Sequence, residues 1–199
     1  QNIVPTALVS TYCSFTPGGI YNSVTGTGSF DQANDGCDTT DWHIPEGLRL
    51  NLTDGAISSA TYTNENGGYT LYAAAGNYTV NPQIENPTYF NISPASAVAN
   101  FPLLDGTTQT KDFCLTANGI HNDLEVIITG GQPRPGFDVT YKLIFKNKGN
   151  QTLSGDVSFG FDDSVCDFVS ALPSINNQTA GLLLWNYSNI LPFETRTID

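Results

Sequence analysis

Short runs of alternating apolar and polar residues fill the chain from about residue 24 to its last residues. In residues 48–54, LRLNLTD, three leucines fall on every second position, which is the period of a strand with one buried face. Turn-forming pairs such as Asn66-Gly67 and Asp105-Gly106 separate these runs at short intervals. No run of useful length shows the 3.6-residue period of an amphipathic helix. The pattern predicts an all-β protein.

The predicted strands fall into two groups that meet at residues 116–119, Thr-Ala-Asn-Gly. The first group covers residues 24–30, 48–54, 57–63, 68–75, 77–84, 88–93, 97–103 and 110–115. The second group has longer strands, within residues 123–130, 138–163, 166–172, 182–188 and 193–199. We predict two tandem β-sandwich domains at residues 23–116 and 117–199, after a linker or the tail of a preceding module at residues 1–22. The second domain shows fewer strands than a seven-stranded sandwich needs, so we expect it to be truncated.

The charge of the chain limits its partners. Nineteen acidic residues against seven basic ones give a net charge of −12, whereas nucleic acid binding needs a patch of Lys and Arg that releases counterions. The same charge disfavours anionic membrane surfaces, and no apolar run approaches the ~18 residues of a membrane span. We therefore expect neither nucleic acid binding nor membrane insertion. Since the chain begins at Gln1 without an initiator Met or a charged leader region, we expect a processed protein or a fragment.

Four cysteines without a Cys-x-x-Cys pair favour disulfides in an oxidising compartment over a zinc site; they are Cys13, Cys37, Cys114 and Cys166. Sequence alone leaves three connectivities open, and free buried cysteines are the alternative. Cys37 follows the opening strand of the first domain and Cys114 lies in its closing strand. Because the first and last strands of such sandwiches are often neighbours, we predict that these two residues pair. An extracellular or cell-surface location follows from this pattern.

Residues 30–42, FDQANDGCDTTDW, gather four carboxylates around Gly36, from Asp31, Asp35, Asp38 and Asp41. With Asp31 as position 1, the acidic positions and the glycine at position 6 come close to a calcium-binding loop. Ala33 and Trp42 depart from that pattern, since they stand where a third side-chain ligand and a bidentate Glu are usual. We expect a Ca²⁺ ion bound by Asp31, Asp35, Asp41 and the Cys37 carbonyl, with Asp38 as a further candidate. The alternative is a turn of Asp and Asn side chains between two strands.

Catalytic motifs are absent from the sequence. It contains only two histidines, His43 and His121, and neither a Gly-x-Ser-x-Gly elbow, a His-Glu-x-x-His helix nor a phosphate-binding glycine loop. A pair of carboxylates of the glycosidase type stays open, because separation in sequence says nothing about separation in space. We expect a non-catalytic protein. A hydrolase fragment is the least favoured alternative.

Aromatic residues on the later strands of the first domain are the other functional candidates: Tyr62, Tyr69, Tyr72, Tyr78, Tyr89 and Phe90. On alternating strands about half of them should be core residues. The remainder could form a platform on which sugar rings stack.

Six segments together carry a resemblance to known proteins: CSFTPGGIYNSVTG, FDQANDGCDTTD, ENPTYFNISPASA, FCLTANGIHNDLEV, RPGFDVTYKLIFKNKGNQTLSG and LLWNYSNILPFETRTI. With these segments the chain resembles a module pair of large secreted proteins of Flavobacteriia and related Bacteroidota. Residues 23–116 resemble the transthyretin-like B-type repeats of Gram-positive adhesins, which often carry calcium at their acidic loop. Residues 117–199 resemble an immunoglobulin-like repeat of bacterial surface proteins. Cys166 departs from the pattern, because relatives tend to have an aliphatic residue there.

This resemblance implies export by the type IX secretion machinery, which would be a partner during export. It also implies O-glycosylation at Asp-Thr/Ser sequences, with Thr39 and Ser164 as candidate sites. We predict a non-catalytic cell-surface or secreted stalk or adhesion module pair, stabilised by calcium and a disulfide. The alternative is a carbohydrate-binding accessory module, whose surface ligand would be a glycan. The short linker at residues 116–122 predicts a semi-rigid rod with Ile120 and His121 in the interface between the domains.

Overall fold

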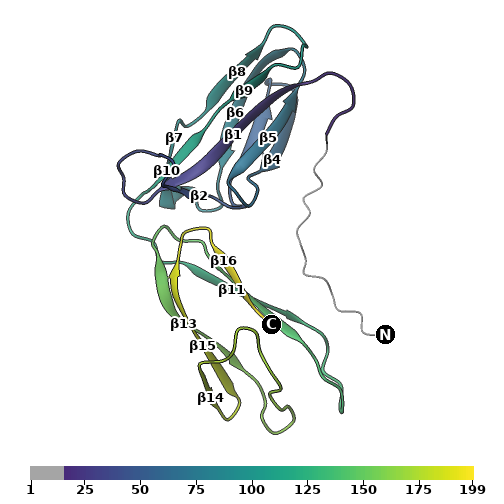
Figure 1. Cartoon of the computed structure of the whole chain (residues 1–199), viewed down its shortest axis with the longest axis vertical. Coiled ribbons are helices and arrows are strands. Elements are labelled where there is room, and N and C mark those ends of the chain that lie inside the picture. The colour runs from purple at the N-terminus through teal and green to yellow at the C-terminus, as the bar shows by residue number, and fades with distance from the viewer. Residues whose placement is uncertain (1–15) are drawn as a thin grey trace.

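The computed structural model describes residues 16–199, which form two β-rich lobes one after the other along the long axis (Figure 1). The lobes contain four sheets and one short 3-10 turn, η1 (Pro87–Tyr89). Across the described part of the chain, no helix is long and apolar enough to cross a membrane. The all-β class predicted from the alternation of apolar residues is confirmed.

The first lobe contains ten strands: β1 (Asn22–Asp31), β2 (Trp42–His43), β3 (Arg49–Thr53), β4 (Ser58–Tyr62), β5 (Gly68–Ala73), β6 (Gly76–Gln83), β7 (Phe90–Ser93), β8 (Ala97–Phe101), β9 (Thr108–Thr110) and β10 (Phe113–Ala117). β1 is the central strand of one sheet. Its first half pairs with β5 and in parallel with β9, and its second half pairs with β2 and in parallel with β10. The other sheet has the order β4-β3-β6-β8.

The core of the first lobe lies between these two sheets. Leu48, Leu50 and Leu52 are all buried in it, as their alternation predicts. Gly26 is required in β1, because a Cβ atom at this position would lie 1.8 Å from the Lys111 carbonyl oxygen. Because glycine has no Cβ atom, the turn between β9 and β10 can approach β1. There the Lys111 N–H donates to the Thr25 carbonyl at 2.8 Å.

The second lobe contains six strands: β11 (Leu124–Gly130), β12 (Tyr141–Asn147), β13 (Leu153–Gly160), β14 (Asn177–Thr179), β15 (Leu182–Ile190) and β16 (Thr195–Ile198). They form two three-stranded sheets, β11-β12-β16 and β13-β15-β14. Leu143 and Phe145 of β12 are buried in one core with Val157 and Trp185 of the other sheet. The apolar face predicted for YKLIFKN therefore packs on the core of this lobe.

Residues 166–172 are not a strand, so that prediction was wrong. The segment follows a turn in which the Val165 and Cys166 N–H groups donate to the Asp162 carbonyl. Its apolar residues contribute separately, since Phe168 packs on the core whereas Val169 is exposed. At its end the Leu172 backbone exchanges two hydrogen bonds with Asp199. The short strands β2 and β14 were not predicted, since two or three residues show no alternation.

Phe193 ties the second lobe to the first. It lies in the turn between β15 and β16, yet it is only 5% exposed and belongs to the core of the first lobe. The ring packs edge-on to Phe30, with centroids 6.0 Å apart, and at 5.0 Å from Phe90. Its backbone has φ +69°, a left-handed conformation that is costly for a bulky residue. The limits of each domain stay a prediction, because one core is completed by a residue from the other lobe.

Polar contacts between the lobes accompany the apolar contact of Phe193. The Lys148 ammonium lies 2.5 Å from Glu85 of the first lobe and 2.9 Å from Glu125 of the second. The side-chain hydrogen bonds to Glu85 and then Glu125 raise the pKa of Lys148 above its ordinary value. The Asn150 amide donates to the Tyr89 carbonyl at 2.7 Å. These contacts restrain the angle between the lobes.

Of the two linker residues predicted to lie in the interface between the lobes, one does. The His121 ring stacks on Tyr89, with centroids 4.0 Å apart and planes 6° apart, so it lies in the junction as expected. Ile120 is 78% exposed, and its predicted place in the interface was wrong. The buried apolar contact between the lobes comes from Phe193 instead.

We expect Phe193→Ala to lower the free energy of unfolding by about 3–5 kcal/mol, the usual cost of emptying a buried Phe site. The two lobes should then unfold in separate transitions. Small-angle scattering should report a wider range of angles between the lobes. Phe137→Ala is the matched control, because Phe137 is a 77% exposed Phe of the same lobe. Equal urea denaturation curves and scattering for the two variants would contradict the role of Phe193.

Candidate functional site

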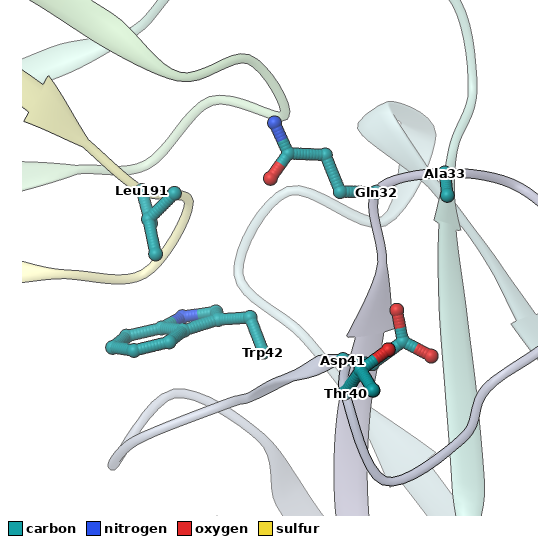
Figure 2. Close-up of a pocket in the computed structure, with 6 residues that line it drawn as sticks. All are labelled: Gln32, Ala33, Thr40, Asp41, Trp42 and Leu191. Atoms are coloured by element: carbon teal, nitrogen blue, oxygen red, sulfur yellow. The ribbon is translucent and has the colours of Figure 1, made fainter.

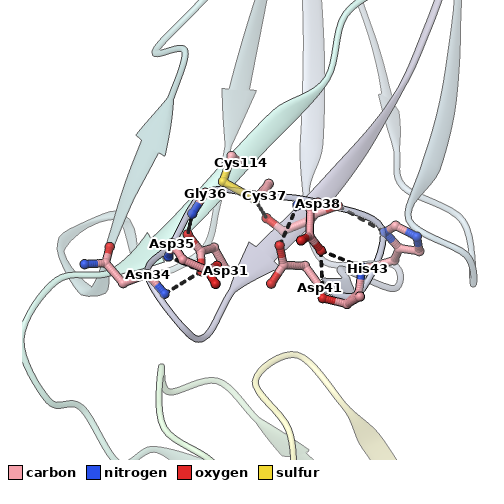
Figure 3. Close-up of a disulfide and its surroundings, with 11 residues drawn as sticks. Asp31, Asn34, Asp35, Gly36, Cys37, Asp38, Asp41, His43 and Cys114 are labelled. Atoms are coloured by element: carbon pink, nitrogen blue, oxygen red, sulfur yellow. Dashed lines mark hydrogen bonds between the residues drawn. A yellow bond between two sulfur atoms is a disulfide. The ribbon is translucent and has the colours of Figure 1, made fainter.

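Asp31 organises the acidic loop between β1 and β2 (Figure 3). It is only 2% exposed, and its carboxylate accepts three backbone hydrogen bonds from its own loop. Asn34 N donates to Oδ1 at 2.5 Å, Asp35 N to Oδ1 at 3.2 Å and Gly36 N to Oδ2 at 2.8 Å. Gly36 has φ +104°, which allows the chain to turn back towards this carboxylate.

The other acidic side chains of the loop also accept local hydrogen bonds. Asp38 Oδ1 accepts from the Thr40 hydroxyl and the Thr40 N–H, each at 2.7 Å. These two bonds, the hydroxyl first, lower the pKa of the Asp38 carboxyl. Asp41 Oδ2 accepts from the Asp38 N–H at 2.7 Å. The His43 ring contacts Ser29, whose hydroxyl lies 3.0 Å from Nδ1.

A disulfide joins the acidic loop to β10. Cys37 and Cys114 are bonded across a sequence separation of 77, with their Cα atoms 5.6 Å apart. They come together because β1 and β10 are neighbours in parallel, with Ser29 opposite Cys114. Cys166 forms no disulfide with another described residue. Cys13 lies outside the residues that the structure describes.

The acidic side chains of the loop serve donors within the loop itself. Asp31, Asp38 and Asp41 direct their oxygens at backbone or hydroxyl donors, as an Asx-rich turn does. Over residues 16–199 no group of three or more His, Cys, Asp or Glu side chains is placed to hold a metal ion. Calcium binding by Asp31, Asp35, Asp38, Asp41 and the Cys37 carbonyl therefore remains a prediction from spacing alone.

An open hollow of about 460 Å³ lies beside this loop, where the two lobes meet (Figure 2). It is lined by Gln32, Ala33, Thr40, Asp41, Trp42 and Leu191. Trp42 is fixed in place because its indole N–H donates to the Pro192 carbonyl at 2.9 Å. Gln32 is held by a hydrogen bond from its amide to the Thr152 hydroxyl at 3.0 Å. Both contacts cross the junction, so the hollow depends on the fixed angle between the lobes.

The hollow combines an aromatic ring with polar groups suited to hydroxyls. The partly buried indole of Trp42 offers a flat apolar surface. Asp41 retains Oδ1 as an acceptor, and Gln32 retains its amide oxygen. Such a set can bind a sugar ring, with stacking on one side and hydrogen bonds at the edge.

Sequence reasoning missed this hollow, although it singled out the neighbouring loop. Trp42 and Pro192 are 150 positions apart, and no spacing rule joins them. The only signal in the sequence is a tryptophan directly after an acidic turn. In the calcium pattern this tryptophan stands where a bidentate Glu is usual.

The predicted aromatic platform is dispersed in the structure. Tyr69 and Phe90 are core residues, and Tyr89 is occupied by His121. Tyr78 packs on the core, Tyr72 meets Tyr21 edge-on at 4.8 Å, and Tyr62 is 45% exposed on β4. These side chains share no single surface.

Thr39 and Ser164, the candidate glycosylation sites, are both exposed. The Ser164 hydroxyl donates to Asp162 at 2.6 Å. Exposure permits modification of these residues, and glycosylation stays a prediction from the resemblance.

Comparisons with known proteins find only distant structural likenesses. No protein-family model and no curated protein matches it. A candidate carbohydrate-binding protein of Bacteroides uniformis matches 90% of this chain and 78% of its own, with 14% identity and a TM-score of 0.34. A DUF3823 family protein of Parabacteroides merdae matches 88% of this chain and 79% of its own, with 12% identity and a TM-score of 0.32. At such low identities and TM-scores the likeness carries no argument about this chain.

We expect Asp31→Asn to destabilise the protein by about 1–3 kcal/mol, the usual cost of an unsatisfied buried polar group. An amide has one acceptor oxygen, so its NH₂ group would face at least one of the three N–H donors. Asp35→Asn is the matched control, because it removes the same charge from an exposed position of the same loop. Urea denaturation in the presence of a chelator makes the measurement; equal stabilities would show that charge, not hydrogen bonding, governs the loop.

The calcium prediction has a separate test. A cation that binds only the folded state raises the melting temperature. If the sequence pattern is right, millimolar Ca²⁺ raises the melting temperature of the wild type relative to chelator and leaves Asp31→Asn unchanged. Identical melting curves with and without Ca²⁺ would remove calcium from the description of this loop.

Proposed function

We propose that this chain is a non-catalytic, glycan-binding module pair of a secreted or cell-surface protein. The observation that carries the proposal is the Trp42 hollow at the junction, with Asp41 and Gln32 at its edge. The disulfide in an all-β chain supports an extracytoplasmic location.

The shape of the hollow suits a sugar better than a small apolar ligand. It is open to solvent, and polar residues line it beside the indole (Figure 2). Apolar ligands are usually enclosed by a pocket, whereas sugars are bound at open sites by ring stacking and hydrogen bonds. Because the hydrogen bonds of Trp42 and Gln32 cross the junction, the site is preorganised before a ligand arrives.

A stalk or adhesion segment is the second candidate, and the junction supports it. The buried Phe193 and the Lys148 ion pairs resist bending between the lobes, as a projecting rod requires. The two roles are compatible, since a rigid stalk can carry a glycan site. Export by the type IX secretion machinery of Bacteroidota belongs to this proposal and rests on the sequence resemblance alone.

The test is a glycan array with the whole chain, followed by titration of any bound glycan. We expect Trp42→Ala to weaken binding at least about tenfold, which corresponds to ~1.4 kcal/mol of lost stacking. Gln32→Ala, an exposed position, should weaken it less and without unfolding the protein.

Tyr62→Ala is the matched control, because Tyr62 is an exposed aromatic residue on β4 of the first lobe. It should leave binding unchanged. Circular dichroism on each variant separates lost binding from lost folding. The proposal fails if no glycan binds, or if Tyr62→Ala abolishes binding while Trp42→Ala does not.

A further inference from the structure

β11 is an edge strand that exposes three consecutive apolar residues. It pairs with β12 on one side, and no other described strand pairs with it. Val126, Ile127 and Ile128 are 48%, 49% and 51% exposed. Val126 and Ile128 lie opposite Phe145 and Leu143, so they occupy the inner face of the sheet, where their partners are almost fully buried. This end of the sheet is therefore apolar on both faces and open at its edge.

β8 shows that an edge strand of this protein need not be so exposed. It also ends a sheet and carries one exposed valine, Val98 at 65%. Its inner residues Ala99 and Phe101 are 0% and 1% exposed, however. The open apolar face thus distinguishes β11 from β8.

β11 also lacks most of the features that prevent edge strands from pairing, and its one charged side chain, Glu125, is bound to Lys148 at 2.9 Å. Edge strands are commonly protected by a lysine, a proline or a bulge. Residues 124–130, LEVIITG, contain neither lysine nor proline, and their register with β12 is continuous over all seven positions. The strand is a regular template for another strand.

The charges around β11 suit a second copy of this chain as the partner. In an antiparallel, twofold-symmetric pairing centred on Ile127, Val126 faces Ile128 of the other copy and Glu125 faces Thr129. No like charges then lie opposite each other. Across β12, Lys146 lies opposite Glu125 and Lys142 opposite Thr129. Each glutamate would thus lie in a row that has a lysine at both ends.

We propose that two copies associate through β11 to form one continuous six-stranded sheet. Their backbones exchange hydrogen bonds along the free edges, and the Val126 and Ile128 side chains of both copies form one apolar stripe. Each copy carries a net charge of −12, so long-range repulsion opposes this association. The dimer should therefore strengthen as ionic strength rises and screens that repulsion.

Sedimentation equilibrium on the full chain tests the proposal. The average mass should rise from 21.4 kDa towards twice that value as the concentration increases from ~10 µM to ~1 mM, and more so at higher salt. Ile127→Lys should abolish the rise, because it places two lysines opposite each other at the symmetry axis. Val98→Lys is the matched control on the other edge strand, and it should leave the dimer intact.

Cross-linking gives an independent readout that does not depend on a destabilising charge. In a background that carries Cys13→Ser and Cys166→Ser, Ile127→Cys should be joined between copies by a short bismaleimide, whereas Val98→Cys should not. A monomer at every concentration and salt overturns the proposal. So does a dimer that survives Ile127→Lys, since it would use another surface.

Discussion

The insertion of Phe193 into the first lobe is the contact on which the rest of the structure depends. A turn residue of one lobe completes the core of the other, beside Phe30 and Phe90. Its left-handed backbone is held by the surrounding turn, where the Phe193 N–H donates to the Asn147 carbonyl at 2.8 Å. Asn147 is itself fully buried, and its side chain binds the carbonyls of Gln151 and Ile190. The strain at Phe193 is thus supported by a buried hydrogen-bond network as well as by apolar burial.

The junction explains why chemically useful groups gather there. Trp42 and Gln32 each need a partner from the second lobe to be held in place, namely Pro192 and Thr152. If the lobes moved independently, as small inter-domain contacts usually allow, both side chains would lose these hydrogen bonds. Burial of Phe193 therefore orders a polar surface that lies outside the core.

The sequence reveals those parts of the structure that follow from local periodicity. The alternation of Leu48, Leu50 and Leu52 predicted their strand, and Leu143 and Phe145 did the same in the second lobe. Cys37 and Cys114 could be matched because Cys37 follows the opening strand of the first lobe and Cys114 lies in its closing strand.

Contacts between distant segments were beyond that reasoning. Phe193 has the pattern of the first residue of a strand, and nothing local shows that it leaves its own lobe. Asp31 matched the first position of a calcium loop, but spacing cannot tell whether a carboxylate will meet a cation or its own backbone N–H groups. Residues 166–172 are rich in apolar residues, yet they contribute them one at a time from an irregular path.

The parallel pairing of β1 and β10 has a mechanical consequence. β1 begins the first lobe at its far end, and β10 leaves it at the junction, so tension along the molecule pulls these neighbouring strands in opposite directions (Figure 1). Their hydrogen bonds are then loaded together in shear rather than one by one. If these hydrogen bonds break, the force is transmitted through the Cys37–Cys114 disulfide and not through the chain between the two cysteines, which are 77 positions apart. A stretched molecule can therefore lengthen only outside that covalent loop, and most of the first lobe is shielded from the force.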